Sequence, residues 1–295
     1  MPSASVRKFG CSGFCSLSSV QLSRRPPWQL PKFAHAMWTG GLLGYGLRAG
    51  AIVGYTIAAS TWALLLPKRR AHRRLLEAVP GWAQTMLRLC GVHLHVEGGE
   101  NLPVQEPVIY VSNHSSLLDI PVLVAALPHR LCFLYKKGLE RIPFFGWVLR
   151  RMPYVPITRR ALDAHWQMEL TRQRVRSYGL SPVVFAEGGR SPDGSVRPFR
   201  RGALILAQSL SLPIVPVAIA GTHALLPPHT LRFRPGSARV RIGAPLEVPP
   251  DLGRRAQEEW LQALRERIAG WVAEMSSQTH PHQWTHAPSW NTSLN

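Results

Sequence analysis

The hydrophobic and polar positions along the chain alternate between short apolar runs and longer segments with helical spacing. Apolar runs of strand length occupy residues 92–96, 108–111, 131–135, 182–185, 214–220 and 238–242. Apolar residues recur at helical spacing in 81–89, 119–127, 163–178 and 254–275. Because the strands alternate with helices, the pattern predicts an α/β fold with a central mixed sheet flanked by helices.

Two of these helices have a predicted inward face. In residues 163–178, Trp166 and Leu170 are expected to point inward, and the arginines largely outward. The helix over 254–275 is amphipathic, with its apolar side formed by Trp260, Leu261, Leu264, Ile268 and Trp271.

The amino-terminal part adds a hydrophobic, membrane-associating helix in front of the sheet. Residues 49–66 carry no charged side chain, and their number is just sufficient for a marginal membrane helix. Arg48 shortens the apolar span, so a shallow or re-entrant insertion fits the pattern equally well. A stripe suited to close helix packing in lipid recurs at every fourth position, at Gly46, Gly50, Gly54 and Ala58.

Charge and composition divide the chain further. Residues 1–36 have no acidic side chain and are expected to be a disordered basic arm, either a transit segment or an over-extended start ahead of Met37. Residues 37–75 hold the hydrophobic helix and its basic flank, 76–275 form one domain, and 276–295 are a disordered tail. Downstream residues are expected on the cytoplasmic face of a membrane, because a basic cluster follows the apolar run directly, at Lys68, Arg69, Arg70, Arg73 and Arg74.

His114 and Asp119 are the first candidates for catalysis. They follow the apolar run 108–111, and the residues around them are loop and cap formers, so the histidine is expected just beyond a strand end. Side chains five positions apart on one helix diverge, so the pair requires a loop between them. Asp119 is also expected to be the N-cap of the next helix. The alternative is that Asp119 is only a cap and His114 only a polar loop residue.

A second candidate cluster follows the apolar run 182–185. Glu187 and Arg190 lie on a turn that Gly188 and Gly189 allow to be sharp. Arg190 can present a planar fork to two phosphate oxygens, and backbone N–H groups around the glycines could add donors. Loops at strand ends are where sites gather in parallel sheets. The alternative is a turn closed by a surface Glu–Arg pair that needs no function.

Together these segments resemble the 1-acylglycerol-3-phosphate acyltransferase family, whose members carry an Asn-His-x-x-x-x-Asp block and then a Phe-x-Glu-Gly-Thr-Arg block. The resemblance covers about Val92 to Pro245, and two further blocks fit it, one at 133–147 leading into 155–159 and the other at 212–219. The chain departs from the family where Gly189 replaces the usual threonine, Pro153 a frequent glycine and Thr158 a frequent acidic residue. These departures affect substrate preference more than chemistry.

The resemblance implies acyl transfer from acyl-CoA or acyl carrier protein to the sn-2 hydroxyl of 1-acylglycerol 3-phosphate, giving phosphatidic acid in phospholipid biosynthesis. By this resemblance, His114 is expected to remove the hydroxyl proton while Asp119 fixes the imidazole tautomer. The acceptor's phosphate and glycerol would be held by Glu187, Gly188, Gly189, Arg190, Arg159 and Lys136. Arg159 could instead be simply solvated or face lipid headgroups, because Arg150, Arg151 and Arg160 lie close by in the sequence. Neither a cofactor nor a metal is implied, because the acyl thioester is a co-substrate.

Several alternatives stay open. The acceptor could instead be lyso-ornithine lipid, lysocardiolipin or glycerol 3-phosphate. The chain could also be a non-catalytic peripheral protein that binds anionic lipid. The segment from Phe144 to Val148 could pack in the core, dip into the bilayer or line an acyl-chain path.

Composition narrows the partners. The 295 residues carry a formal net charge of +19 at pH 7, which attracts polyanions. Zinc-finger spacing, a basic heptad helix and an aromatic RNA-binding signature are missing from the sequence, so an anionic membrane surface is favoured over nucleic acid. Four scattered cysteines do not make a disulfide framework, and a reducing compartment is expected. His93 and His95 fit solvent-facing alternation better than a metal site.

Overall fold

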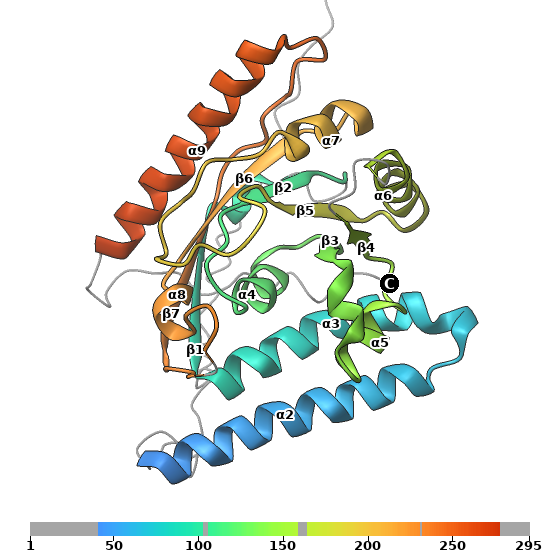
Figure 1. The fold of residues 1–295 in the computed structure, drawn as a ribbon, viewed down its shortest axis with the longest axis vertical. Helices are drawn as coiled ribbons and strands as arrows, with labels where there is room; N and C mark the ends of the chain where they lie inside the picture. Colours follow the sequence, from blue (N-terminus) through green and yellow to red (C-terminus); the bar gives the residue numbers. More distant parts are fainter. Residues whose placement is uncertain (1–40, 103–105, 159–163, 231, 278–295) are drawn as a thin grey trace, which may run out of the picture.

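A mixed sheet with helices on both faces organises the protein (Figure 1). The computed structural model describes residues 41–102, 106–158, 164–230 and 232–277. Across these residues the chain forms a seven-stranded sheet with the order β1-β7-β6-β2-β5-β3-β4. The strands are β1 (Val92–Glu97), β2 (Ile109–Ser112), β3 (Leu131–Lys136), β4 (Val155–Ile157), β5 (Ser181–Phe185), β6 (Ile214–Ala220) and β7 (Gly236–Ile242). Neighbouring strands are parallel except β6 and β7, which are antiparallel, so the predicted α/β class with a mixed sheet is confirmed.

Period-two alternation sends side chains of each central strand into two different cores. On β2, Ile109 and Val111 belong to the core under α7 (Gly202–Leu210) and α9 (Arg254–Ser277). Tyr110 points to the opposite core, which includes residues of α3 (Lys68–Cys90) and α4 (Asp119–Ala126). Every residue of β2 and β6 is buried, which explains why both strands are apolar apart from Ser112.

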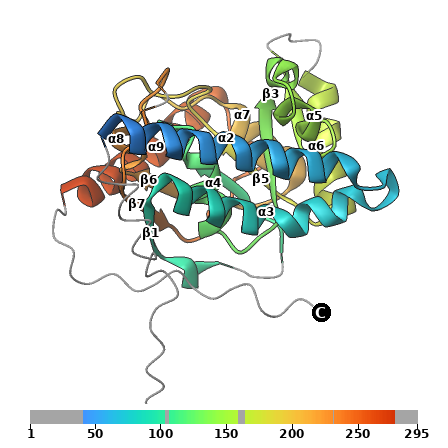
Figure 2. The ribbon, with the colours of Figure 1, turned by 90° about the horizontal axis from the view of Figure 1, so that it is seen from below.

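The remaining helices lie around the sheet and its two cores. α2 (Gly41–Leu65) lies beside α3 on the side away from the sheet, as Figures 1 and 2 show. α6 (Ala164–Tyr178) packs near the β4 edge. The shorter elements are η1 (Gly99–Asn101), η2 (Lys137–Arg141), α5 (Phe145–Leu149) and α8 (Thr222–Leu225).

Two helix predictions need correction, and one is confirmed. The helix expected over 81–89 begins at Lys68 and contains Pro80, because tertiary packing of its amphipathic face outweighs the proline. Trp166, predicted to face inward, is 54% exposed, since α6 buries Thr171 and Val175 instead. In α9, the predicted apolar face is buried at Leu261, Leu264 and Ile268.

The predicted amino-terminal hydrophobic stretch forms α2. Of the helices within the described ranges, none combines the length and the apolar character needed to cross a membrane. Among the described residues, the glycine stripe does not pack against another helix, because a Cβ added at Gly46, Gly50 or Gly54 would meet none of their atoms within 4 Å. The buried side of α2 is formed instead by residues such as Ile52 and Ala63.

The predicted domain limits lie only partly within the described residues. The boundary expected between residues 75 and 76 falls inside α3, which continues through it. The arm predicted over 1–36 lies outside the described residues. So does the predicted tail, apart from Ser276 and Ser277, which end α9.

Candidate active site

His114 and Asp119 form a hydrogen-bonded pair at the carboxyl end of β2. The distance from His114 Nδ1 to Asp119 Oδ2 is 2.7 Å. The His114 side chain is 13% exposed and the Asp119 side chain 1% exposed. An ionised carboxylate only accepts hydrogen bonds, so in a neutral imidazole Nδ1 carries the proton and Nε2 keeps the lone pair. The basic nitrogen of the neutral ring therefore lies on the side away from Asp119.

Asp119 is held by the loop that precedes it. Its Oδ2 also accepts the backbone N–H groups of Ser115, at 2.8 Å, and of Ser116, at 2.9 Å. The predicted N-cap role is wrong, because Asp119 is the first residue of α4 and the cap position is Leu118, which makes no side-chain capping bond. The carboxylate turns back toward the loop and fixes the histidine instead of capping the helix.

Two neighbours that sequence reasoning missed also hold the histidine. Asn113 clamps the loop to β6, since its Nδ2 donates to the Ile219 carbonyl at 2.9 Å and its Oδ1 accepts the Ile219 N–H at 2.8 Å. The Phe185 ring stacks on the His114 ring with centroids 3.9 Å apart and planes 15° apart. The phenylalanine at the start of the second block was a usable signal for this stacking.

Ser115 has a different partner from the histidine. Its Oγ lies 3.3 Å from Thr222 Oγ1, and the residue is buried. A serine nucleophile needs its hydroxyl group hydrogen-bonded to the base that removes its proton. The arrangement therefore favours direct action of His114 on a substrate hydroxyl.

Glu187 joins the second sequence block to the first. Its side chain is fully buried, its Oε1 accepts the His114 backbone N–H at 2.9 Å, and its Oε2 accepts Arg197 Nε–H at 3.3 Å. Burial raises the pKa of Glu187, while the His114 N–H and Arg197 favour its charged form and oppose that shift. The Glu–Arg pair anticipated with Arg190 is therefore formed with Arg197.

The glycine turn brings Arg190 to the same strand end. Gly188 has φ of +73°, a backbone conformation that favours glycine, whereas Gly189 has no such restriction. Next to Arg190, the Ser191 N–H donates to the His114 carbonyl at 2.7 Å. The Arg190 guanidinium forms no ion pair within the described ranges. The two blocks thus adjoin, as the sequence predicted.

Lys136 and Arg159 remain predictions as substrate-binding residues. Lys136 ends β3 and is exposed, and its ammonium has no ion pair with any other described residue. Arg159 lies outside the described residues. His93 is exposed, and in the part of the chain that the structure describes no three His, Cys, Asp or Glu residues lie close enough to hold a metal ion.

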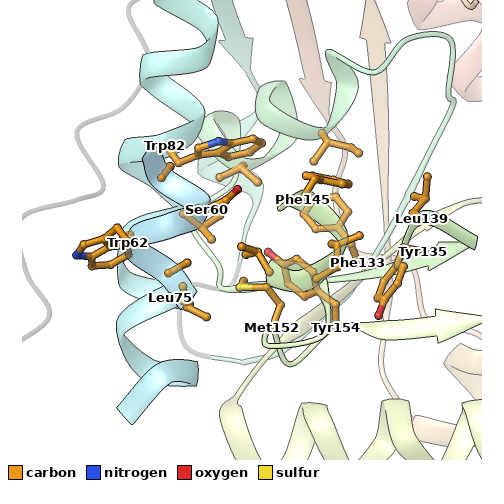
Figure 3. Close-up of a pocket in the computed structure, with 18 of the residues that line it drawn as sticks. Ser60, Trp62, Leu75, Trp82, Phe133, Tyr135, Leu139, Phe145, Met152 and Tyr154 are labelled. Carbon is orange, nitrogen blue, oxygen red and sulfur yellow. The ribbon is translucent and has the colours of Figure 1, made fainter. Parts of the chain in front are cut away.

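An apolar pocket of about 440 Å³ opens beside α4 (Figure 3). Residues of α2, α3, α4, α5, β3 and the segment before β4 line it, among them Trp82, Ile120, Phe133, Phe145, Val148 and Tyr154. Ile120 directly follows Asp119, so one wall of the pocket belongs to the helix that begins at the catalytic candidate. Of the segment predicted as core or lipid-facing, Phe145 and Val148 line this pocket, while Trp147 is 40% exposed.

The fold and the site are those of an α/β acyltransferase domain. The family model described as Acyltransferase matches residues 93–220, which include His114, Asp119 and the glycine turn. The crystal structure of the 1-acyl-sn-glycerophosphate acyltransferase from Thermotoga maritima superposes with a TM-score of 0.65 at 26% identity, covering 81% of this chain and 97% of that one.

The chain belongs to the 1-acylglycerol-3-phosphate acyltransferase family. It is 30% identical to the 1-acyl-sn-glycerol-3-phosphate acyltransferase of Cocos nucifera, over 77% of this chain and 75% of that protein. It is 34% identical to a chloroplastic relative from Arabidopsis thaliana, over 68% of this chain and 56% of that protein. A chloroplastic relative from Brassica napus is 36% identical over 51% of this chain and 44% of that protein. The chain thus spans about half the length of these two chloroplastic relatives.

Proposed function

We propose that the protein transfers an acyl group from acyl-CoA or acyl carrier protein to the sn-2 hydroxyl of 1-acylglycerol 3-phosphate, giving phosphatidic acid. The observation that carries the proposal is the 2.7 Å contact between His114 Nδ1 and Asp119 Oδ2, which leaves Nε2 free as a base. Relatives from Cocos nucifera and Pseudomonas aeruginosa, named 1-acyl-sn-glycerol-3-phosphate acyltransferases, support this choice of acceptor.

The proposed reaction needs one proton carrier. His114 Nε2 takes the proton of the acceptor hydroxyl while the oxygen attacks the thioester carbonyl. The carbon–sulfur bond then breaks, and the thiolate leaves with the proton that the imidazolium returns. Asp119 stabilises that imidazolium. The thioester is already activated, so the step uses no cofactor and no covalent enzyme intermediate.

The same geometry gives the substrates their places in this proposal. Arg190, with no internal ion-pair partner in the described ranges, binds the acceptor's phosphate. Lys136 and Arg159 are further candidates for that anion. The apolar pocket lined by Ile120 and Val148 takes an acyl chain, because its volume lies in the usual range for ligand sites, about 300–1,000 Å³.

We also propose that the protein works at the cytoplasmic surface of an anionic membrane. Large apolar side chains of α2 are exposed, including Val53, Ile57 and Trp62, and exposed Arg73 and Arg74 follow on α3. An apolar face beside basic side chains is typical of helices at lipid surfaces. This surface equally supports the second candidate function, non-catalytic binding of anionic lipid.

Purified protein with labelled donor separates the two functions. Acyl-CoA and acyl carrier protein donors are each tested with 1-acylglycerol 3-phosphate, glycerol 3-phosphate, lysocardiolipin and lyso-ornithine lipid. The proposal expects the fastest transfer to 1-acylglycerol 3-phosphate. Binding to anionic vesicles without transfer to any acceptor would favour the lipid-binding protein, and faster transfer to another acceptor would change the substrate.

A further inference from the structure

Arg197 contacts both ends of the glycine turn, although it belongs to neither sequence block. Its Nε lies 3.3 Å from Glu187 Oε2, and its Nη2 donates to the Gly189 carbonyl at 2.8 Å. One guanidinium therefore bridges the two residues that flank Gly188. The planar, forked geometry of arginine suits two acceptors held in fixed directions, which a lysine cannot match.

The backbone on each side of Arg197 is fixed by other elements. Arg265 of α9 donates to the Val196 carbonyl from Nε, at 3.1 Å, and from Nη2, at 2.9 Å. The Arg200 N–H donates to the Ala186 carbonyl at 2.8 Å. Arg197 thus extends from an anchored segment, and its side chain is 40% exposed.

Glu187 connects Arg197 with the histidine. Its carboxylate is fully buried, with one oxygen on the His114 backbone N–H at 2.9 Å and the other on Arg197. A buried carboxylate needs such donors to stay charged. Loss of Arg197 would leave Glu187 either protonated or turned toward another cation.

Arg190 is the cation close by in sequence. Arg197 occupies Glu187 Oε2, and the Arg190 side chain has no ion pair among the described residues. An arginine already paired with an internal carboxylate would have to break that pair before it could bind a phosphate.

We propose that Arg197 is a positioning residue which, by bridging Glu187 and Gly189, fixes the backbone at His114 and keeps Arg190 free for the acceptor's phosphate. The proposal rests on the proposed acyl transfer. It assigns Arg197 no contact with substrate.

Kinetics of the full chain test the positioning role. R197M is expected to lower kcat/KM for 1-acylglycerol 3-phosphate by about tenfold or more, and R197K by less, since lysine keeps the charge but not the fork. Within an E187Q background, R197M should change kcat/KM by less than about threefold. Since Glu187 is easier to protonate without Arg197, the acidic limb of the pH profile of kcat/KM should move to higher pH in R197M. The same substitution in the E187Q background should not move it. Equal losses in both backgrounds would mean that Arg197 acts without Glu187 and would overturn the proposal.

Thermal unfolding tests the same pairing without any turnover. The Tm loss of R197M/E187Q should be smaller than the summed losses of R197M and E187Q. The exposed pair Arg255–Glu259 on α9 provides the control, and R255M and E259Q should show additive effects. Additive Tm losses at Arg197 and Glu187 would contradict the inference. Absence of transfer by the wild-type protein with either donor would instead contradict the proposed function.

Discussion

At the scale of single residues, the site depends on the buried carboxylate of Glu187, which accepts hydrogen bonds from two loops. Glu187 accepts one donor from the His114 loop and one from Arg197, so it stabilises both strand ends at once. Each such hydrogen bond to a charged group contributes about 1.5–3 kcal/mol. The cost of burying Glu187 is visible in its pKa, which burial raises above the ordinary value of 4.5.

That shift predicts a pH dependence of stability. The native state holds a proton on Glu187 at pH values where the unfolded chain has released it. The contribution of this bound proton to the free energy of unfolding is fully present below pH 4.5 and is lost as pH rises through the native pKa of Glu187. The difference in unfolding free energy between wild type and E187Q should therefore fall as pH rises from 4.5. Urea unfolding at several pH values measures it, with the exposed E247Q as control. A constant difference would show that Glu187 does not titrate as described.

The sequence predicts the residues of the site better than their partners. His114, Asp119 and Glu187 meet because the two loops that hold them follow neighbouring buried parallel strands, which is readable from apolar runs. Arg197 was missed because it belongs to an irregular loop whose path depends on Arg265 of α9, a contact between distant parts of the chain. Local sequence carries no signal for such a contact.

At the scale of elements, the helices around β3 create the apolar pocket. α2 and α3 form one wall and α4 and α5 others, so the pocket needs both the amino-terminal helices and the α/β core (Figure 3). The helix predicted over 81–89 was too short because Pro80 and the basic residues before it obscure the amphipathic pattern. The pocket itself could not be predicted, since the sequence does not show which helices pack together.

Filling the pocket should shorten the preferred acyl chain. Val148 lines it from α5, and V148W would remove room for terminal methylenes, each worth about 0.8 kcal/mol of burial. We expect kcat/KM to fall several-fold for long donors and little for short ones. I142W, at a 45% exposed position outside the pocket lining, is the matched control. Equal losses for all chain lengths in V148W would show that the pocket does not hold the acyl chain.

At the scale of the whole molecule, topology gathers functional groups from the full length of the domain. Strand pairing of β2 with β5 and β6 places the His114 loop beside the glycine turn and Ile219. Alternation of strands and helices predicts this class of fold. The parallel pairing of β1 with β7, at the two ends of the domain, could not be predicted, because register between distant strands leaves no local pattern.

The net charge of +19 and the exposed face of α2 predict salt-dependent binding to anionic vesicles. Screening weakens this attraction as ionic strength rises, whereas the apolar part persists. W62S on α2 should lower the bound fraction at both low and high salt. W166S, at a 54% exposed tryptophan on α6, should not. Co-sedimentation measures both variants, and equal loss in the two would argue against a membrane-facing α2.

Acyl transfer by H114A and S115A, measured beside the wild-type protein, tests the central claim most directly. Both variants should unfold cooperatively, which thermal unfolding checks. The account predicts that H114A forms phosphatidic acid no faster than background, because the base is gone, while S115A stays within about threefold of wild type. An H114A variant as active as wild type, or an S115A variant as inactive as H114A, would contradict direct deprotonation of the acceptor by His114.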